Sequence, residues 1–278
     1  MKDLVGQTFL VTGANTGIGL ATACDLALRG GRLYIACRSE AKGRAVVDDI
    51  VRTTGNEAVA FLSLDLADLA SVRRCAEDFL ALGQPLHGLI NNAGVAGHQG
   101  ITRDGFELAF GVNHLGHFLL TTALLDCLVA SAPARVVTVS SDGHYRAKGI
   151  DFTMLRKPTH SITGFPEYAV SKLCNVLFTQ ELGRRLAGRG VTTYAVNPGA
   201  VASDIWRRVP WPIRPLIKMP MRSTEDGART SVYCATAPEL AGVTGRFYDN
   251  CRERQPSRVV SDELARLLWE HSETWTAA

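Results

Sequence analysis

Residues Thr8–Gly19 read TFLVTGANTGIG, an apolar run that leads into a turn with three glycines. The run predicts a short buried strand, and a helical pattern follows the turn as far as about Arg29. Glycines let the backbone approach a pyrophosphate closely, and a helix N-terminus offers unpaired N–H groups and a favourable dipole. We therefore expect a phosphate-binding loop here, although glycines at this spacing also suit an ordinary tight turn.

Strand and helix patterns alternate along the rest of the chain. Such alternation demands a parallel sheet with helices on both faces. We find no repeat, low-complexity tract or linker that divides the sequence, so we expect an α/β protein with a single Rossmann-type, doubly wound parallel sheet of about seven strands, in one domain over residues 1–278. The further strands are predicted at 33–37, 58–64, 86–90, 135–139, 191–196 and 245–248, and the further helices at 40–53, 69–82, 106–129, 165–187, 223–235 and from 261 onward.

Composition limits the classes of function. The chain of 278 residues is 46% hydrophobic and 21% charged, which is ordinary for a globular protein. A net charge of +3 without a long basic run argues against a nucleic-acid partner. The seven cysteines stand singly and form no Cys-x-x-Cys pair, so we expect a reducing compartment and neither a disulfide framework nor a zinc site. No apolar run approaches the ~20 residues of a membrane span, and a strand begins near the N-terminus, so we expect a cytoplasmic protein without a signal peptide or transmembrane segment.

Polar and small residues follow several of the predicted strands, at the edge where ligands bind in open α/β sheets. Arg38 follows the second strand, where an acidic residue would bind the ribose hydroxyls of NAD. An arginine suits a 2′-phosphate instead and favours NADP, unless it is simply a solvated residue. Adjacent asparagines such as Asn91-Asn92 also form simple turns. The other strand ends are Asp65-Leu66, Ala93-Gly94, Ser140-Ser141 and Asn197–Val201.

Tyr168 and Lys172 lie one turn apart on a predicted helix that has Pro166 and Glu167 in its first turn. The ammonium would favour the phenolate and lower the pKa of a phenol that is normally ~10. Such a tyrosine could exchange a proton with a substrate oxygen near neutral pH. The simpler interpretation is an exposed polar pair on an amphipathic helix.

The predicted helix at 106–129 contains three polar residues with possible roles in a site. Asn113 is a poor helix former and needs a hydrogen-bond partner inside an apolar helix. His114 and His117 are spaced like a pair of metal ligands. No carboxylate or third ligand stands nearby in the pattern, so we expect no metal there.

Two segments differ from the regular pattern. Residues 142–165 form a long predicted loop, and such loops tend to be functional or mobile. Residues 204–222 mix four prolines with apolar side chains and five basic residues, which predicts a lid over an apolar pocket. The basic residues could meet an acidic substrate, a membrane surface or an acidic carrier protein, or form a solvated face.

The motifs occur in one order along nearly the whole chain, and the ordered set is far more specific than any single member. It resembles the short-chain dehydrogenase/reductase family. Finer stretches resemble the retinol dehydrogenase-like branch, which mostly prefers NADP(H) and acts on lipophilic aldehydes, ketones and alcohols. The stretches that carry the resemblance are Thr12–Gly19, Tyr34–Arg38, Asn91–Gly94, Val112–Thr121, Ser140-Ser141, Tyr168–Thr179 and Asn197–Gly199.

The resemblance implies a role for each matching residue. Tyr168 is the general acid/base, and Lys172 binds the nicotinamide ribose and holds the pKa of that tyrosine down. Ser141 orients the substrate oxygen, and Asn113 holds a water that links Lys172 to solvent. The implied cofactor-binding residues, besides Tyr168 and Lys172, are Gly13, Asn15, Thr16, Gly17, Ile18 and Gly19 at the pyrophosphate, Arg38 at the 2′-phosphate, Asp65 and Leu66 at the adenine, Asn91, Ala93 and Gly94 at the ribose, and Pro198, Gly199, Val201 and Ser203 at the nicotinamide end.

The chemistry of these residues agrees with the resemblance, because the cofactor carries the hydride and the protein need only position a carbonyl and supply one proton. We expect an NADP(H)-dependent oxidoreductase that interconverts an aldehyde or ketone and an alcohol on a lipophilic small molecule. The alternatives are a reductase for an acidic or carrier-bound metabolite and a non-catalytic dinucleotide-sensing protein. By analogy with the family we expect a homodimer or homotetramer.

Overall fold

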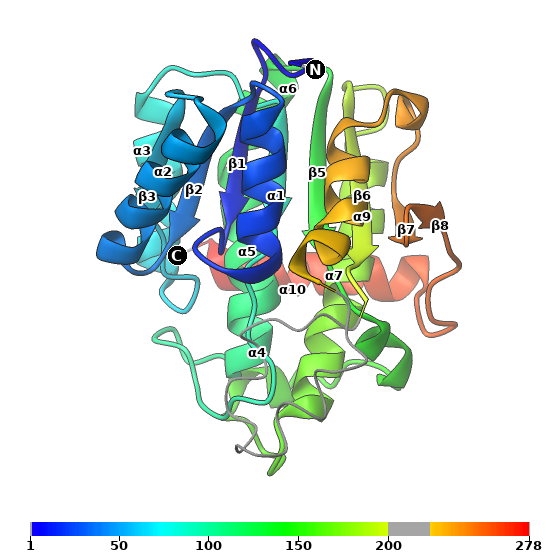
Figure 1. Cartoon of the computed structure of the whole chain (residues 1–278). Helices are drawn as coiled ribbons and strands as arrows, with labels where there is room; N and C mark the ends of the chain where they lie inside the picture. Colours follow the sequence, from blue (N-terminus) through cyan, green and yellow to red (C-terminus); the bar gives the residue numbers. More distant parts are fainter. Residues whose placement is uncertain (1, 200–222, 278) are drawn as a thin grey trace.

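One sheet organises the protein, and its strands run in the order β3-β2-β1-β4-β5-β6-β7-β8 (Figure 1). The computed structural model describes residues 2–199 and 223–277. Every neighbouring pair from β3 to β7 is parallel, and only β8 is antiparallel, to β7. This arrangement confirms the predicted doubly wound sheet. The strands are β1 (Thr8–Thr12), β2 (Arg32–Cys37), β3 (Val59–Ser63), β4 (Gly88–Asn91), β5 (Ala134–Val139), β6 (Val191–Asn197), β7 (Arg246–Asp249) and β8 (Arg252–Glu253).

Helices cover both faces of the sheet (Figure 1). On one face α1 packs against α2 and α9, and on the other α3 packs against α5, and α7 against α10. Side-chain caps fix where several helices begin, as where Asp68 accepts hydrogen bonds from the amides of Ala70 and Ser71. The helices are α1 (Gly17–Leu28), α2 (Glu40–Thr54), α3 (Leu69–Ala81), α4 (Leu108–Phe110), α5 (Gly116–Ala123), α6 (Leu125–Ala130), α7 (Phe165–Arg185), α9 (Thr224–Thr236) and α10 (Asp262–Thr276).

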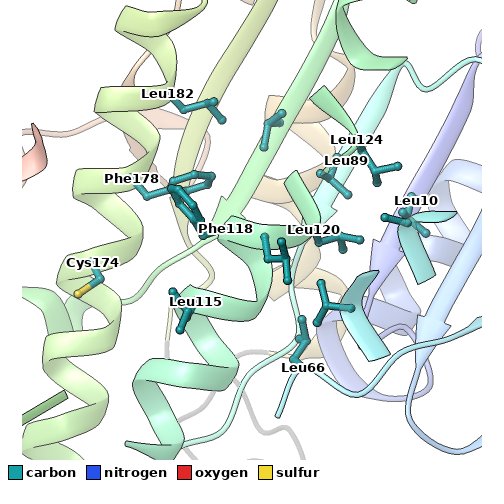
Figure 2. Close-up of a cluster of buried hydrophobic side chains, with 14 of the residues drawn as sticks. Leu10, Leu66, Leu89, Leu115, Phe118, Leu120, Leu124, Cys174, Phe178 and Leu182 are labelled. Carbon is teal, nitrogen blue, oxygen red and sulfur yellow. The ribbon is translucent and has the colours of Figure 1, made fainter. Parts of the chain in front are cut away.

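The larger hydrophobic core lies around α5, between the sheet and α7. Figure 2 shows Leu10 and Leu89 of the sheet on one side of α5 and Phe178 of α7 on the other. Phe118 of α5 is 1% exposed and meets Phe178 edge-on, at 5.7 Å between ring centroids. Burying each such side chain contributes roughly 1.5–3 kcal/mol, so this core holds α5 and α7 firmly against the strand ends that carry the polar residues.

Among the described residues the sheet has eight strands, which corrects the expected count of about seven. The additional strand, β8, joins β7 through a two-residue turn in which Asn250 and Cys251 have φ of 50° and 60°. Two positive φ values in succession are the geometry of a tight hairpin turn, which usually shows Asn-Gly in the sequence. Because Cys251 takes the place of that glycine, nothing in the sequence pattern marks the hairpin.

The structure also corrects the helix that was predicted at 106–129. It is interrupted by η1 (Gly111–Leu115), a π-helical turn in which the amide of Gly116 bonds to the carbonyl of Gly111. A π turn inserts one extra residue and is often found at functional sites, and here it contains Asn113.

The segment 142–165 forms two short 3-10 turns, η2 (Asp142–Arg146) and η3 (Met154–Arg156). It is pinned to the chain before α4, where Thr159 donates to the buried Glu107 and the amide of Glu107 donates to the carbonyl of Leu155. The expected lid at 204–222 lies outside the described residues. Within the described ranges, none of the helices has the length and apolar character needed to cross a lipid bilayer.

Candidate active site

The carboxyl ends of β1, β4, β5 and β6 bring most of the expected site residues to one edge of the sheet. The strand order reverses between β1 and β4, which both lie in the middle of the sheet. Ligands of open α/β sheets bind outside the strand ends at such a reversal.

The glycine loop between β1 and α1 is shaped by very close contacts. Gly13 and Gly17 have φ of +67° and +59°, a conformation that side chains rarely adopt. At Gly19 a methyl group would lie 2.4 Å from Nδ2 of Asn92 and 2.5 Å from the carbonyl oxygen of Gly13. The same Nδ2 donates to the carbonyl of Thr12 at 2.8 Å. Position 19, in the first turn of α1, therefore tolerates only glycine. Asn15 and Thr16 lie in the loop, and Ile18 lies in the first turn of α1.

Arg38 and the pair Asp65-Leu66 lie at neighbouring strand ends on the β2–β3 side. Arg38 is exposed directly after β2, and it has no hydrogen bond or ion pair with any other residue in the described part of the chain. Asp65 accepts from the amide of Ala67 at 3.0 Å. Leu66 is buried, and its carbonyl would lie 2.8 Å from a methyl group placed on Gly116.

The residues Asn91–Gly94 at the end of β4 face different parts of the protein. The Asn91 side chain is 1% exposed and donates to Oγ1 of Thr121 on α5 at 2.9 Å, so it points into the core rather than toward the loop. Ala93 packs against Gly13 of the glycine loop. A methyl group on Gly94 would lie 3.1 Å from Oδ1 of Asn113, which shows how closely this strand end passes over the π turn.

The Asn113 side chain is fully engaged inside the protein. Its Oδ1 accepts from the amide of Val95 at 2.8 Å, and its Nδ2 donates to the carbonyl of Val95 and to Oγ of Ser171. Ser171 in turn donates to the carbonyl of Tyr168 at 2.7 Å. The side-chain amide of Asn113 therefore joins Val95, which follows the end of β4, to the first turns of α7.

Lys172 is buried one helical turn after Tyr168 on α7. Its Nζ donates to the carbonyl of Val139 at 2.8 Å and lies 5.6 Å from the centroid of the Tyr168 ring. Burial disfavours the ammonium and lowers the pKa of Lys172 to about 7.

Burial also raises the pKa of the Tyr168 phenol, and a hydrogen bond with Ser141 partly offsets that effect. The expected lowering of this pKa by Lys172 is therefore wrong for the protein without a cofactor. The physical reason is that desolvation disfavours the charged form of both groups, and the Lys172 ammonium points at a carbonyl instead.

Ser141 caps the start of η2 and is separated from the end of β5 by Ser140. Its Oγ accepts from the amide of Gly143 at 3.1 Å, which leaves the hydroxyl hydrogen for Tyr168 or a substrate oxygen. Its carbonyl accepts from Nδ1 of the buried His144 at 2.7 Å, and Nε2 of His144 accepts from the amide of Ser257 at 3.1 Å. His144 was not predicted, because only the folded chain brings residue 257 beside it.

The end of β6 completes the described edge. Asn197 accepts from the amides of Asp142 and Gly199, at 3.3 and 3.1 Å, so it joins this strand end to the turn that holds Ser141. Pro198 is buried, and Gly199 has φ of +78°. Two expected nicotinamide contacts, Val201 and Ser203, lie outside the described residues.

The two histidines beside Asn113 point in different directions. Nε2 of His114 lies 3.1 Å from Oγ of Ser272 on α10, whereas Nε2 of His117 lies 2.8 Å from Oγ1 of Thr12 on β1. They therefore do not form a common ligand pair. Among the described residues, a groove of about 750 Å³ between α1 and α9 is lined by none of Asn113, Ser141, Tyr168 or Lys172.

Comparisons with known proteins agree with this geometry. A family model described as short chain dehydrogenase matches residues 7–151. Human retinol dehydrogenase 12 is 47% identical over 278 residues, which are 97% of this chain and 86% of that protein. Human dehydrogenase/reductase SDR family member 13 is 44% identical over 282 residues, 98% of this chain and 74% of that protein. A crystal structure of an uncharacterized protein from Mycobacterium Paratuberculosis has a TM-score of 0.78 at 33% identity and covers 99% of this chain and 95% of its own. The glycine loop, the strand-end residues and these relatives together place the chain in the short-chain dehydrogenase/reductase family of oxidoreductases, among its retinol dehydrogenase-like members.

Proposed function

We propose that the protein is an NADP(H)-dependent oxidoreductase that interconverts an aldehyde or ketone and an alcohol on a lipophilic small molecule. One observation carries the proposal: Asn113, Ser141, Tyr168 and Lys172 gather at the sheet edge that also bears the glycine loop. These residues come from three segments far apart in the sequence, and buried hydrogen bonds orient Asn113 and Lys172. A non-catalytic dinucleotide-sensing protein would have no need for this set.

In this proposal Tyr168 gives a proton to the substrate oxygen during reduction and takes it back during oxidation. Ser141 directs its hydroxyl hydrogen at the same oxygen, because the hydrogen bond from the Gly143 amide uses the hydroxyl oxygen as an acceptor and leaves the O–H available to donate. A bound nicotinamide cofactor supplies or accepts the hydride, so the chain contributes orientation and one proton.

Lys172 and Asn113 would return the proton to solvent. A pKa of about 7 lets Lys172 exchange a proton near neutral pH. The Asn113 amide is occupied by Val95 and Ser171, so we propose that the carbonyl of Asn113, rather than its side chain, holds the water that was expected there. That carbonyl accepts a hydrogen bond from Nδ1 of His117, and a carbonyl oxygen has two lone pairs.

The glycine loop fits a dinucleotide, because the backbone at Gly13, Gly17 and Gly19 lacks the side chains that would fill the space beside a pyrophosphate. Arg38 supports NADP(H) over NAD(H). Its guanidinium is exposed at the end of β2 and has no partner among the described residues that would compete with a 2′-phosphate.

The surroundings of Tyr168 support an apolar substrate. The Phe165 ring is 44% exposed and meets the Tyr168 ring edge-on, with centroids 6.4 Å apart. The name of the relative retinol dehydrogenase 12 makes retinal the first substrate to test. An acidic or carrier-bound substrate depends on residues 204–222, which lie outside the described ranges.

The single domain, the cytoplasmic location and the homodimer or homotetramer stay predictions. Seven free cysteines support a reducing compartment, and cell fractionation would test the location. Light scattering would measure the oligomeric state, and limited proteolysis would test whether the chain is one domain.

The experiment that tests the proposed function compares wild type with Tyr168→Phe. NADPH oxidation is followed across aldehydes, ketones and enals, including retinal, and NADPH binding is titrated separately by fluorescence. We expect Tyr168→Phe to lose roughly 10²-fold or more in kcat and to keep its NADPH affinity. Tyr233→Phe on α9 is the matched control and should keep both. A Tyr168→Phe enzyme as fast as wild type would contradict the mechanism, and wild type that binds NADPH but reduces no carbonyl would favour the non-catalytic alternative.

A further inference from the structure

His117 is a buried polar group that the proposed chemistry does not use. Its side chain lies on α5, between the end of β1 and the π turn, and is 1% exposed. Nε2 lies 2.8 Å from Oγ1 of Thr12, and Nδ1 lies 3.1 Å from the carbonyl oxygen of Asn113. Both ring nitrogens therefore have a partner, and the two partners belong to different parts of the site.

The partners determine where every proton of this network resides. A carbonyl only accepts, so Nδ1 of His117 carries the hydrogen and donates it to Asn113. Nε2 must then accept, so the Thr12 hydroxyl donates to it. The oxygen of Thr12 accepts from the amides of Asn92 and Ala93, at 2.9 and 3.0 Å. Burial lowers the pKa of His117 to about 4, which keeps the imidazole neutral as this arrangement requires.

The network joins three segments that surround the proposed cofactor site. Thr12 directly precedes Gly13 of the glycine loop. Ala93 packs against Gly13, and the next residue, Gly94, passes close over Asn113. Without the imidazole, the Thr12 hydroxyl has only a 3.4 Å contact with the carbonyl of Ile90, and nothing would connect it to Asn113.

We propose that His117 is a positioning residue that fixes the glycine loop, the β4 strand end and the π turn of Asn113 relative to one another, through the Thr12 hydroxyl and the Asn113 carbonyl. This inference rests on the proposed function, because it assigns His117 to the dinucleotide site of that function. His117 itself touches neither substrate nor cofactor in this assignment.

The alternative is that His117 merely fills the core, and His114 supplies a matched control for it. Both histidines are fully buried on the same helical segment, but His114 bonds to Ser272 on α10 and packs among Phe110, Phe118 and Phe178. A residue with a purely structural role should affect thermal stability when replaced and leave the dinucleotide site unchanged.

The experiment compares His117→Phe with His114→Phe and Thr12→Val with Thr12→Ser. Fluorescence titration measures the Kd for NADPH, thermal denaturation measures Tm, and amide hydrogen exchange of the unliganded protein measures protection at Asn92 and Ala93. We expect His117→Phe and Thr12→Val to raise the Kd by roughly tenfold, the scale of one lost buried hydrogen bond, and to lose protection at both amides. Thr12→Ser and His114→Phe should keep the wild-type Kd and protection, with a lower Tm for His114→Phe.

The double variant Thr12→Val/His117→Phe should raise the Kd for NADPH by clearly less than the product of the two single effects, because both substitutions remove the same bond between Thr12 and His117. Wild-type Kd and protection in His117→Phe, or an equal loss in His114→Phe, would overturn the inference. If His117→Phe does not fold, the Thr12 pair decides: equal values for Val and Ser would overturn it. Wild type that binds neither NADPH nor NADH would refute the proposed function, whereas the exchange measurements still test the network.

Discussion

Replacing Lys172 with methionine should stabilise the protein while it abolishes activity. The Lys172 side chain is 3% exposed, and burial lowers its pKa from 10.5 to about 7. At about 1.36 kcal/mol per pKa unit, holding this group in the folded protein costs roughly 4–5 kcal/mol of unfolding free energy at low pH. Methionine removes that cost and fills similar space. The Val139 carbonyl keeps its bond from Asn175 at 3.0 Å, so no buried acceptor is left unpaired.

The sign of the pH dependence follows from the lowered pKa. Between pH 7 and about 10.5 the unfolded chain binds a proton at Lys172 that the folded protein does not, so wild type gains stability as pH rises through this window. Below pH 7 both states are protonated, and the full cost is present. His117 and Tyr168 do not titrate between pH 7 and 9.5, because burial lowers the pKa of His117 to about 4 and raises that of Tyr168.

Urea unfolding of the cofactor-free protein at pH 6.5, 8 and 9.5 measures this effect. We expect Lys172→Met to exceed wild type by about 2–4 kcal/mol at pH 6.5, somewhat below the full cost because water can relax around a buried charge. The advantage should shrink steadily toward pH 9.5. Lys148→Met replaces an exposed lysine and should change stability by less than about 0.5 kcal/mol at every pH. A Lys172→Met protein that is no more stable at pH 6.5, or an advantage that does not change with pH, would refute the reasoning.

Three further substitutions test the site. Arg38→Ala should raise the Kd for NADPH by roughly tenfold or more, the effect of one lost charged hydrogen bond, and leave the Kd for NADH unchanged. Arg32→Ala, at the opposite end of β2, should change neither Kd. Equal losses of affinity for both cofactors would contradict the NADP assignment. Gly19→Ala places a methyl group 2.5 Å from the carbonyl oxygen of Gly13. It should lower the free energy of unfolding in urea by about 1–3 kcal/mol and abolish dinucleotide binding. Normal dinucleotide binding would show that the backbone can adjust to the methyl group. His144→Phe removes the hydrogen bond to the Ser141 carbonyl and should lower kcat about tenfold in steady-state assays while the affinity for NADPH stays unchanged. An unchanged kcat would show that Ser141 does not need His144 to hold its position.

Much of the fold could be predicted from the sequence, because its signals are local. The glycine turn after the Thr8–Val11 run, the serine cap at Ser223 and the alternation of strand and helix depend on residues that are neighbours in the chain. They were enough to predict the parallel sheet and the helix with Tyr168 and Lys172 one turn apart. The hairpin at Asn250-Cys251 was missed because a positive φ at a cysteine has no sequence signature.

The sequence by itself determined which residues meet at the sheet edge, since strand ends and helix turns follow from short-range pattern. Only the tertiary structure decided how they behave there. The π turn at Asn113, the bonds of His117 to Thr12 and of His144 to Ser257, and the inward direction of Asn91 all join residues that are distant in the chain or depend on packing. The pKa directions of Tyr168 and Lys172 belong to the same class, because desolvation is set by everything packed around a group and not by its neighbours in sequence.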